Sequence, residues 1–240
     1  MKQILLYTFL FSCLALKGQD YQVSLKSWGV NDGLSDRQVN AIYKDTRGFI
    51  WLCTRKGLNR FDGYTFKVYT KEKDGLPFNF IARMAEDVNG SFWVVGSYRF
   101  DTNNLFIFDP LTKKVTTFQE KTGYKENIRV DFVQKTDDST LLLGSTLDNF
   151  FFTWHPAHGL HKIPYPVEVD LVITTGENNT FWVRNKTGQL CEINLQGALL
   201  RKINTTNVAK STQPHMGINA IYVRDSRKNN TYKLATQVHV

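Results

Sequence analysis

The chain is poor in the residues that mark metal centres and disulfide-stabilised modules. Three of its 240 residues are cysteine and five are histidine, and no Cys-x-x-Cys pair or mixed Cys/His spacing typical of a metal site occurs. Cys53 and Cys191 are isolated in strand-like surroundings. We expect both to be small buried hydrophobic side chains, although an exported chain could oxidise them to a disulfide. We therefore expect no metal and no other cofactor.

Long apolar runs and blocks of like charge are also scarce. One nearly uninterrupted apolar run, Ile4 to Leu16, follows Lys2 and is shorter than the roughly 20 residues that a transmembrane helix needs. Residues 1–18 therefore read as a signal peptide, and the mature protein as periplasmic without a membrane span. A lipoprotein anchored at Cys13 is the alternative. The net charge is +8, but no run of five like charges suggests a nucleic-acid-binding arm.

What the sequence does contain is an internal repeat. Trp51 and Trp93 lie 42 positions apart, and Asp45-Thr46-Arg47-Gly48 matches Asp87-Val88-Asn89-Gly90. The units span about 33–74, 75–122, 123–166, 167–213 and an incomplete 214–240. Each unit reads as four short strands. In the first unit we place them at Val39–Lys44, Phe49–Thr54, Leu58–Phe61 and Tyr64–Tyr69, with Asp62-Gly63 as a hairpin turn.

Units of about 40 to 45 residues with four strands each are typical of propeller blades. The predicted fold is an all-β propeller of four-stranded antiparallel blades, with about four blades and part of a fifth over residues 19–240. Residues 21–30 read as an outer strand that would close the ring against a last blade. We therefore expect an incomplete ring from a longer protein, whose partners are the remaining blades or another copy of the chain.

The repeated residues favour structural roles. Trp51, Trp93 and Trp182 recur at the centre of a strand, where aromatic side chains pack between blades. Asp45 and Asp87 lie in tight turns, where aspartate accepts hydrogen bonds from its own backbone. The structural set comprises Asp45, Gly48, Trp51, Thr54, Gly57, Asp87, Gly90, Trp93 and Trp182. Sugar stacking on the tryptophans and catalysis by the aspartates are the alternatives that we do not favour.

The run from Gly33 to Tyr69 resembles the two-component regulator propeller repeat. The residues that carry the resemblance are Gly33, Leu34, Ser35, Asp45, Gly48, Ile50, Trp51, Thr54, Gly57, Leu58, Arg60, Phe61 and Asp62. Cys53 stands where glycine is usual, the second unit matches up to Gly96, and the third and fourth units match weakly. The resemblance thus covers roughly a third of the chain.

This resemblance implies the periplasmic sensor region of a hybrid histidine kinase of the Bacteroidetes type. Such regions usually hold two tandem seven-bladed propellers, followed by a membrane helix and the kinase. Many members sense carbohydrate fragments. Kinase motifs are absent from this chain, so the resemblance implies a sensor that is not itself an enzyme.

The strand order predicts where a ligand would bind. Turns after the second and fourth strands of every blade fall on one face of the ring. We therefore expect an oligosaccharide to meet this face, through Arg37, Arg55, Lys56, Phe78, Asn79, Tyr98, Arg99 and Arg184. Arginine, amide and aromatic side chains suit sugars and acidic sugars. A solvated loop rim without a ligand is the alternative.

Two other functions are weaker alternatives. A secreted scaffold for protein–protein contacts would need no small ligand. A polysaccharide-active enzyme would need paired carboxylates, and the sequence does not indicate such a pair. His155, His158 and His161 could suggest a metal site, but Pro156 and Pro164 argue against a helix, so we expect a loop with incidental histidines.

Overall fold

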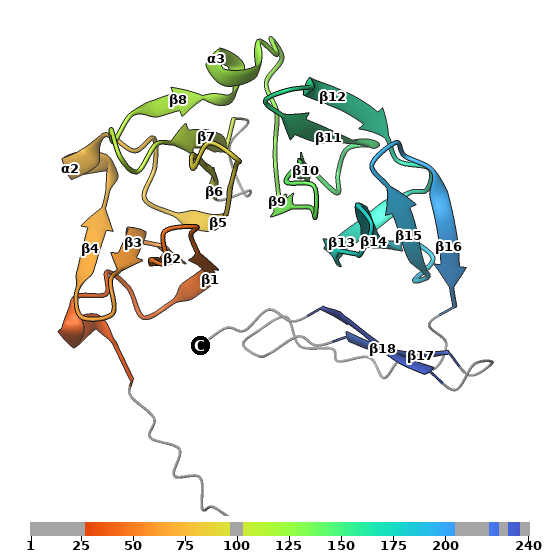
Figure 1. Ribbon diagram of the computed structural model, residues 1–240, viewed down its shortest axis with the longest axis horizontal. Coiled ribbons are helices and arrows are strands. Elements are labelled where there is room, and N and C mark those ends of the chain that lie inside the picture. The colour runs from red at the N-terminus through yellow and green to blue at the C-terminus, as the bar shows by residue number, and fades with distance from the viewer. Residues whose placement is uncertain (1–26, 97–102, 205–220, 226–229, 236–240) are drawn as a thin grey trace, which may run out of the picture.

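The structure is a computed structural model that describes residues 27–96, 103–204, 221–225 and 230–235, the last two ranges by their backbone alone. The predicted all-β fold is confirmed. Four four-stranded antiparallel sheets and a two-stranded sheet follow one another around an arc that does not close into a ring (Figure 1). No helix in the described ranges is long and apolar enough to cross a membrane.

Each of the four blades is a simple up-and-down sheet in chain order. The first blade holds β1 (Val39–Lys44), β2 (Ile50–Thr54), β3 (Gly57–Phe61) and β4 (Phe66–Tyr69). The second holds β5 (Ile81–Glu86), β6 (Phe92–Gly96), β7 (Leu105–Phe108) and β8 (Val115–Thr117). The third holds β9 (Phe132–Lys135), β10 (Leu141–Gly144), β11 (Phe150–His155) and β12 (Gly159–Pro164). The fourth holds β13 (Val169–Thr175), β14 (Thr180–Asn185), β15 (Leu190–Asn194) and β16 (Leu199–Ile203), and β17 (Ile221–Asp225) and β18 (Asn230–Ala235) form the two-stranded sheet.

Short helices occupy the connections between elements. They are the 3-10 helix η1 (Val30–Asp32), α2 (Lys71–Asp74) after the first blade and α3 (Phe118–Thr122) after the second. The Thr117 hydroxyl caps α3 by accepting from the amide of Glu120, whose carboxylate accepts from the amide of Thr117. Gly123 then ends the helix in the left-handed conformation, at φ 75°. The capping box and Gly123 therefore limit α3 to a single short helix in the connection between two blades.

The hydrophobic core lies between adjacent blades. Trp51 is fully buried and stacks on Tyr69, at 5.6 Å between ring centroids, while Phe92 of the next blade meets its face edge-on at 4.7 Å. Trp93 packs in the same way against Trp154 of the third blade, at 4.6 Å. Because each blade buries one apolar face against its neighbour, the stack of sheets supplies the core that a single sheet cannot form.

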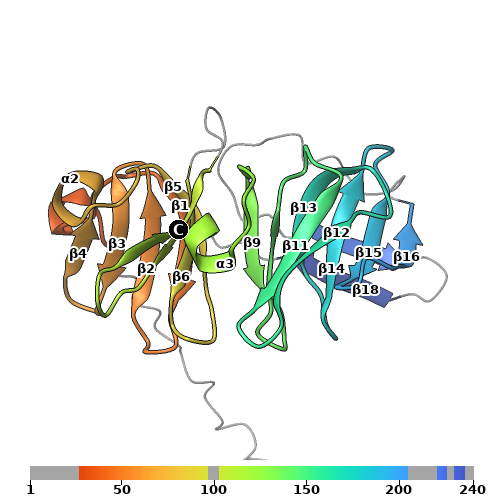
Figure 2. The same cartoon turned by 90° about the horizontal axis from the view of Figure 1, so that it is seen from above.

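The arc of blades has two faces, and Figure 2 views the arc from its edge. The upper face in that view carries α2, the turns after the second strand of the first, third and fourth blades and the connections between blades. The lower face carries the turns after the first and third strands, such as Asp45–Phe49 and Asp62–Thr65. The predicted ligand residues that the structure describes (Arg37, Arg55, Lys56, Phe78, Asn79 and Arg184) lie at the upper face, and the repeated aspartates Asp45 and Asp87 lie at the lower face.

Four sequence predictions differ from the structure in detail. The second strand of the first blade begins at Ile50, one residue later than predicted. The fourth strand of the first blade begins at Phe66, because the Asp62 carboxylate accepts hydrogen bonds from the amides of Tyr64 and Thr65 and holds them in the turn. The segment with three histidines is a β-hairpin formed by β11 and β12 rather than a loop. The third strand begins at Gly57, one residue early.

Several predictions fall on residues that the structure does not describe. The signal peptide at 1–18 and most of the expected closing strand at 21–30 lie outside the described ranges, as do Tyr98 and Arg99. Cys53 and Cys191 are described, and both are free thiols in buried positions, as the isolated-cysteine interpretation predicted.

Candidate functional site

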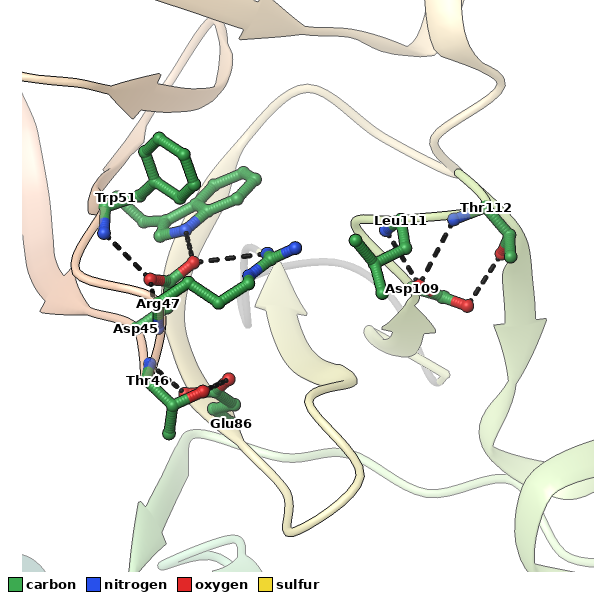
Figure 3. A network of polar contacts seen from close by, with 9 residues as sticks. Asp45, Thr46, Arg47, Trp51, Glu86, Asp109, Leu111 and Thr112 are labelled. Atoms are coloured by element: carbon green, nitrogen blue, oxygen red, sulfur yellow. Dashed lines mark hydrogen bonds and ion pairs between the residues drawn. The ribbon is translucent and has the colours of Figure 1, made fainter.

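The repeated aspartate holds the lower rim of each of the first two blades together. Asp45 accepts from the indole Nε1 of Trp51 at 2.9 Å and from the amides of Arg47 and Phe49 at 3.0 and 2.8 Å (Figure 3). In the second blade, Asp87 accepts from Trp93 Nε1 at 3.1 Å. These carboxylates accept hydrogen bonds from the turn that they close and from the tryptophan of the next strand, which is the structural role that the repeat predicts.

A second carboxylate links neighbouring blades at the same rim. Glu86 is 1% exposed, and its two oxygens accept from the amide and the hydroxyl of Thr46 at 2.9 and 2.7 Å (Figure 3). In the third blade, Leu142 and Thr136 occupy the places of the tryptophan and the aspartate. In the fourth blade, Gly176 takes the place of the aspartate beside Trp182. A Cβ added to Gly176 would lie 3.3 Å from the indole nitrogen of Trp182. The aspartate–tryptophan pair is therefore a feature of the first two blades.

On the upper face, the first blade presents cations that have no ion pair. Arg37, Arg55 and Lys56 are exposed, and the ion pairs of the described residues include none of them. The Arg55 guanidinium lies over the ring of Phe80, 5.8 Å from its centroid. The aromatic ring thus orients one cation toward solvent, and the three charges remain available to a ligand.

Two further predicted ligand residues serve the protein's own structure. The ring of Phe78 packs edge-on against Phe106, at 5.2 Å between centroids, and covers Gly96, where even a Cβ would come within 2.2 Å of the ring. The side-chain oxygen of Asn79 accepts from the amide of Lys71 at 2.7 Å, and its amide group donates to both oxygens of Glu72. Phe78 and Asn79 therefore form part of the upper face, but contacts within the protein already use the Phe78 ring and the Asn79 amide group.

The upper face of the fourth blade is electrically balanced. Arg184 donates through Nε to Asp170 at 2.8 Å and also through Nη2, and Lys186 pairs with Glu168 at 3.1 Å. These pairs are exposed, so each contributes little to stability. Their effect is on charge: Arg184 and Lys186 are each paired with an acid, whereas Arg37, Arg55 and Lys56 of the first blade are in none of the ion pairs of the described residues.

The structure places two surface hollows on the lower face, opposite the predicted ligand residues. One, of about 520 Å³, is bordered by Glu177, Asn178, Glu192 and Arg201 of the fourth blade. The other, of about 570 Å³, lies between the third and fourth blades. Sequence reasoning missed both, because the borders of each hollow come from separate hairpins that only the folded sheets bring together.

The three histidines line the second hollow. The rings of His155 and His158 stack at 5.1 Å, and His161 Nε2 lies 3.0 Å from the carbonyl oxygen of His158. Within the described part of the chain, no group of three or more His, Cys, Asp or Glu side chains is placed to hold a metal ion. The histidine cluster is therefore a hairpin surface in this structure.

Comparison with known proteins relates the first blade to a signalling family. Residues 33–56 match the family model described as two component regulator propeller. Over 66 residues the chain is 44% identical to histidine kinase P4 of Formosa agariphila, a match that covers 28% of this chain and 5% of that protein. The chain thus spans a small part of the relative's length.

Solved structures share the propeller fold at low sequence identity. The extracellular domain of a putative hybrid two component system from B. thetaiotaomicron superposes with a TM-score of 0.61 at 18% identity, covering 90% of this chain and 32% of that one. Virginiamycin B lyase from Staphylococcus aureus superposes with a TM-score of 0.58 at 14% identity, covering 86% and 73%. At such identities the likeness concerns the fold alone.

The family assignment therefore rests on the repeat itself. The matched residues 33–56 run from the start of the first unit into the turn after β2. They include Asp45, Gly48 and Trp51, which form the lower rim described above. Residues 33–56 of the chain thus carry a repeat of the two component regulator propeller family.

Proposed function

We propose that this chain is an extracytoplasmic ligand-sensing propeller segment of a two-component signalling receptor. The observation that carries the proposal is the 44% identity to a histidine kinase over 66 residues. The shared fold with an extracellular domain of a putative hybrid two component system is in keeping with it. In this proposal the chain binds a ligand and performs no chemistry, and phosphotransfer belongs to another part of the receptor.

The ligand of this proposal is an oligosaccharide that meets the upper face at the first blade. Arg37, Arg55 and Lys56 are exposed there without an ion pair among the described residues. Guanidinium groups donate paired hydrogen bonds to carboxylates and vicinal hydroxyls, and Phe80 holds Arg55 in place for this. Arg184 contributes less, because Asp170 already occupies its guanidinium.

A binding screen of the full chain tests this function. Neutral and uronic-acid oligosaccharides would be titrated into the wild-type protein by calorimetry, and then into the double variant Arg55→Gln/Lys56→Gln. The variant Lys44→Gln/Lys114→Gln is the matched control, since it removes the same charge from exposed positions at the lower-face turns. Loss of the charge-assisted hydrogen bonds is expected to weaken binding about tenfold or more.

Comparing the two variants tests the upper-face location of the site separately from the carbohydrate-sensing function. Weakening in the first variant alone supports a ligand on the upper face. Equal binding by all three proteins contradicts the upper-face assignment, and no binding of any oligosaccharide contradicts the carbohydrate-sensing function and favours a scaffold for protein contacts.

A further inference from the structure

We propose that the lower face carries a second binding site, for an oxyanion group of the sulfate or phosphate monoester class, where the outer strands of the first and second blades meet. Its ligating groups are the side chains of Arg47, Arg60, Lys67 and Lys113, which we call the lower-face basic cluster. This site lies on the opposite side of the ring from the oligosaccharide face and is independent of it.

The sheet register brings two of these cations together. In the first blade Trp51 pairs with Arg60, and Arg60 pairs with Lys67, so the three side chains project from the same face of the sheet. That face is the one on which Trp51 packs against the second blade. Side chains directly opposite on antiparallel strands are close neighbours, and like charges there are destabilising. Arg60 and Lys67 therefore form a pair of like charges that destabilises the sheet at this position.

Aromatic rings fix where the cations lie. The Arg60 guanidinium lies over the ring of Phe49 at 4.4 Å from its centroid, and that of Arg47 lies near the same ring at 5.8 Å. The Lys67 ammonium lies 5.3 Å from the ring of Tyr69. These contacts hold the charged groups beside the blade junction before any ligand arrives, which lowers the ordering cost of binding.

The second blade supplies the fourth cation. Lys113 lies in the turn between β7 and β8 in the left-handed conformation, at φ 61°, held by a 2.8 Å hydrogen bond from its amide to the carbonyl of Asp109. It lies near Tyr69: burial raises the pKa of the Tyr69 hydroxyl, the charges of Arg60, Lys113 and Arg47 oppose that rise, and the charge of Asp74 adds to it. Cations from the first and second blades thus both act on the Tyr69 hydroxyl.

The acids around the cluster are already engaged. The Asp45 carboxylate is fully buried and pairs with Arg47 at 3.2 Å, which is the one ion pair that the cluster makes among the described residues. Asp109 accepts from the hydroxyl of Thr112 at 2.7 Å and from the amide of Leu111 at 2.8 Å (Figure 3). Asp62 accepts from the amides and the hydroxyl of its own turn. Asp74, which also acts on Tyr69, accepts from the amide of Thr70 at 2.9 Å, so each of these acids is already hydrogen-bonded.

One donor in the cluster has no acceptor among the residues that the structure describes. Arg60 Nε is buried and makes no hydrogen bond within the described structure. An unsatisfied buried donor on a charged group is costly, and an incoming oxyanion would remove that cost. Guanidinium and ammonium groups together suit a group with three oxygens and up to two negative charges, which a sulfate or phosphate ester provides.

The test uses the full chain and inorganic sulfate and phosphate as probes. Thermal unfolding and calorimetric titration would be run at constant ionic strength, with sodium chloride as the reference salt. The test variant is Arg60→Gln/Lys67→Gln, and the control Lys71→Gln/Lys73→Gln removes two exposed cations from α2 on the upper face. Both ions are expected to bind the wild type and the control, and the test variant is expected to bind about tenfold or more weakly.

A single variant and two esters sharpen the result. Lys113→Gln changes one exposed side chain and is expected to weaken binding as well, which guards against misfolding of the double variant. Titrations with glucose 6-sulfate and glucose 6-phosphate show whether the site prefers a sulfate ester or a phosphate ester, since the preferred ester binds more tightly. The proposal is overturned if all variants respond to the ions as the wild type does, if the control loses as much affinity as the test variant, or if neither ester binds.

Discussion

Replacing Asp45 by alanine should destabilise the protein by several kcal/mol, because one carboxylate satisfies a buried indole donor and two half-buried backbone amides. Its oxygens accept from Trp51 Nε1 and from the amides of Arg47 and Phe49, at 2.8 to 3.0 Å. Trp51 is fully buried, so water cannot replace the lost acceptor. Each buried donor left unsatisfied costs about 1–3 kcal/mol, so we expect a loss of about 3–5 kcal/mol. Domains of this kind have a total stability of only about 5–15 kcal/mol.

Asp62→Ala is the matched control for this change. Asp62 accepts from two backbone amides and a hydroxyl in the same kind of turn, at 2.8 to 3.1 Å, but its turn is exposed. Water can therefore take over its hydrogen bonds, and we expect a much smaller loss. Urea unfolding followed by circular dichroism gives the free energy of unfolding of both variants. Equal losses for the two variants would refute the reasoning that burial makes the Asp45 interactions valuable.

Three further predictions concern packing, reactivity and pH. Gly96→Ala should lower the free energy of unfolding by about 1–3 kcal/mol, because the new Cβ would meet the ring of Phe78; unchanged urea unfolding would contradict this. Burial raises the pKa of the Cys53 thiol, so a thiol reagent at pH 8 should label it only after unfolding. Although burial acts to raise the pKa of Asp109, hydrogen bonds from Thr112 and Leu111 and the charge of Arg47 lower it overall. Its contribution to stability should therefore be lost as the pH falls below about 4, and Asp109→Asn should show a shallower decline of melting temperature with acid.

The sequence predicted the blades well because their signals are local. The turn residues Asp45 and Gly48 and the apolar strand that follows them define a hairpin by themselves, and β1 begins and ends where the pattern placed it. The helix α3 could also have been found, since Thr117 and Glu120 form a capping box and Gly123 follows. The four-residue helix α2 is too short for a periodic signal.

The candidate site was harder to predict because its state depends on contacts between distant segments. Nothing local to Arg184 indicates that Asp170 will neutralise it, since the pairing of β13 with β14 decides that. Asn79 suits a sugar by residue type, yet α2 binds it. Likewise, Arg60 reads as a repeat residue in the sequence, and only the register with Lys67 reveals a cluster of positive charge.

The central claim is that ligand sensing takes place on the upper face at the first blade, and hydrogen exchange tests it most directly. Amide exchange of the full chain would be measured with and without the oligosaccharide that binds most tightly in the screen. The account predicts slower exchange in the turn between β2 and β3 and in the connection that contains α2. Protection confined to the lower-face turns, such as Asp45–Phe49 or the β11–β12 hairpin, would contradict it.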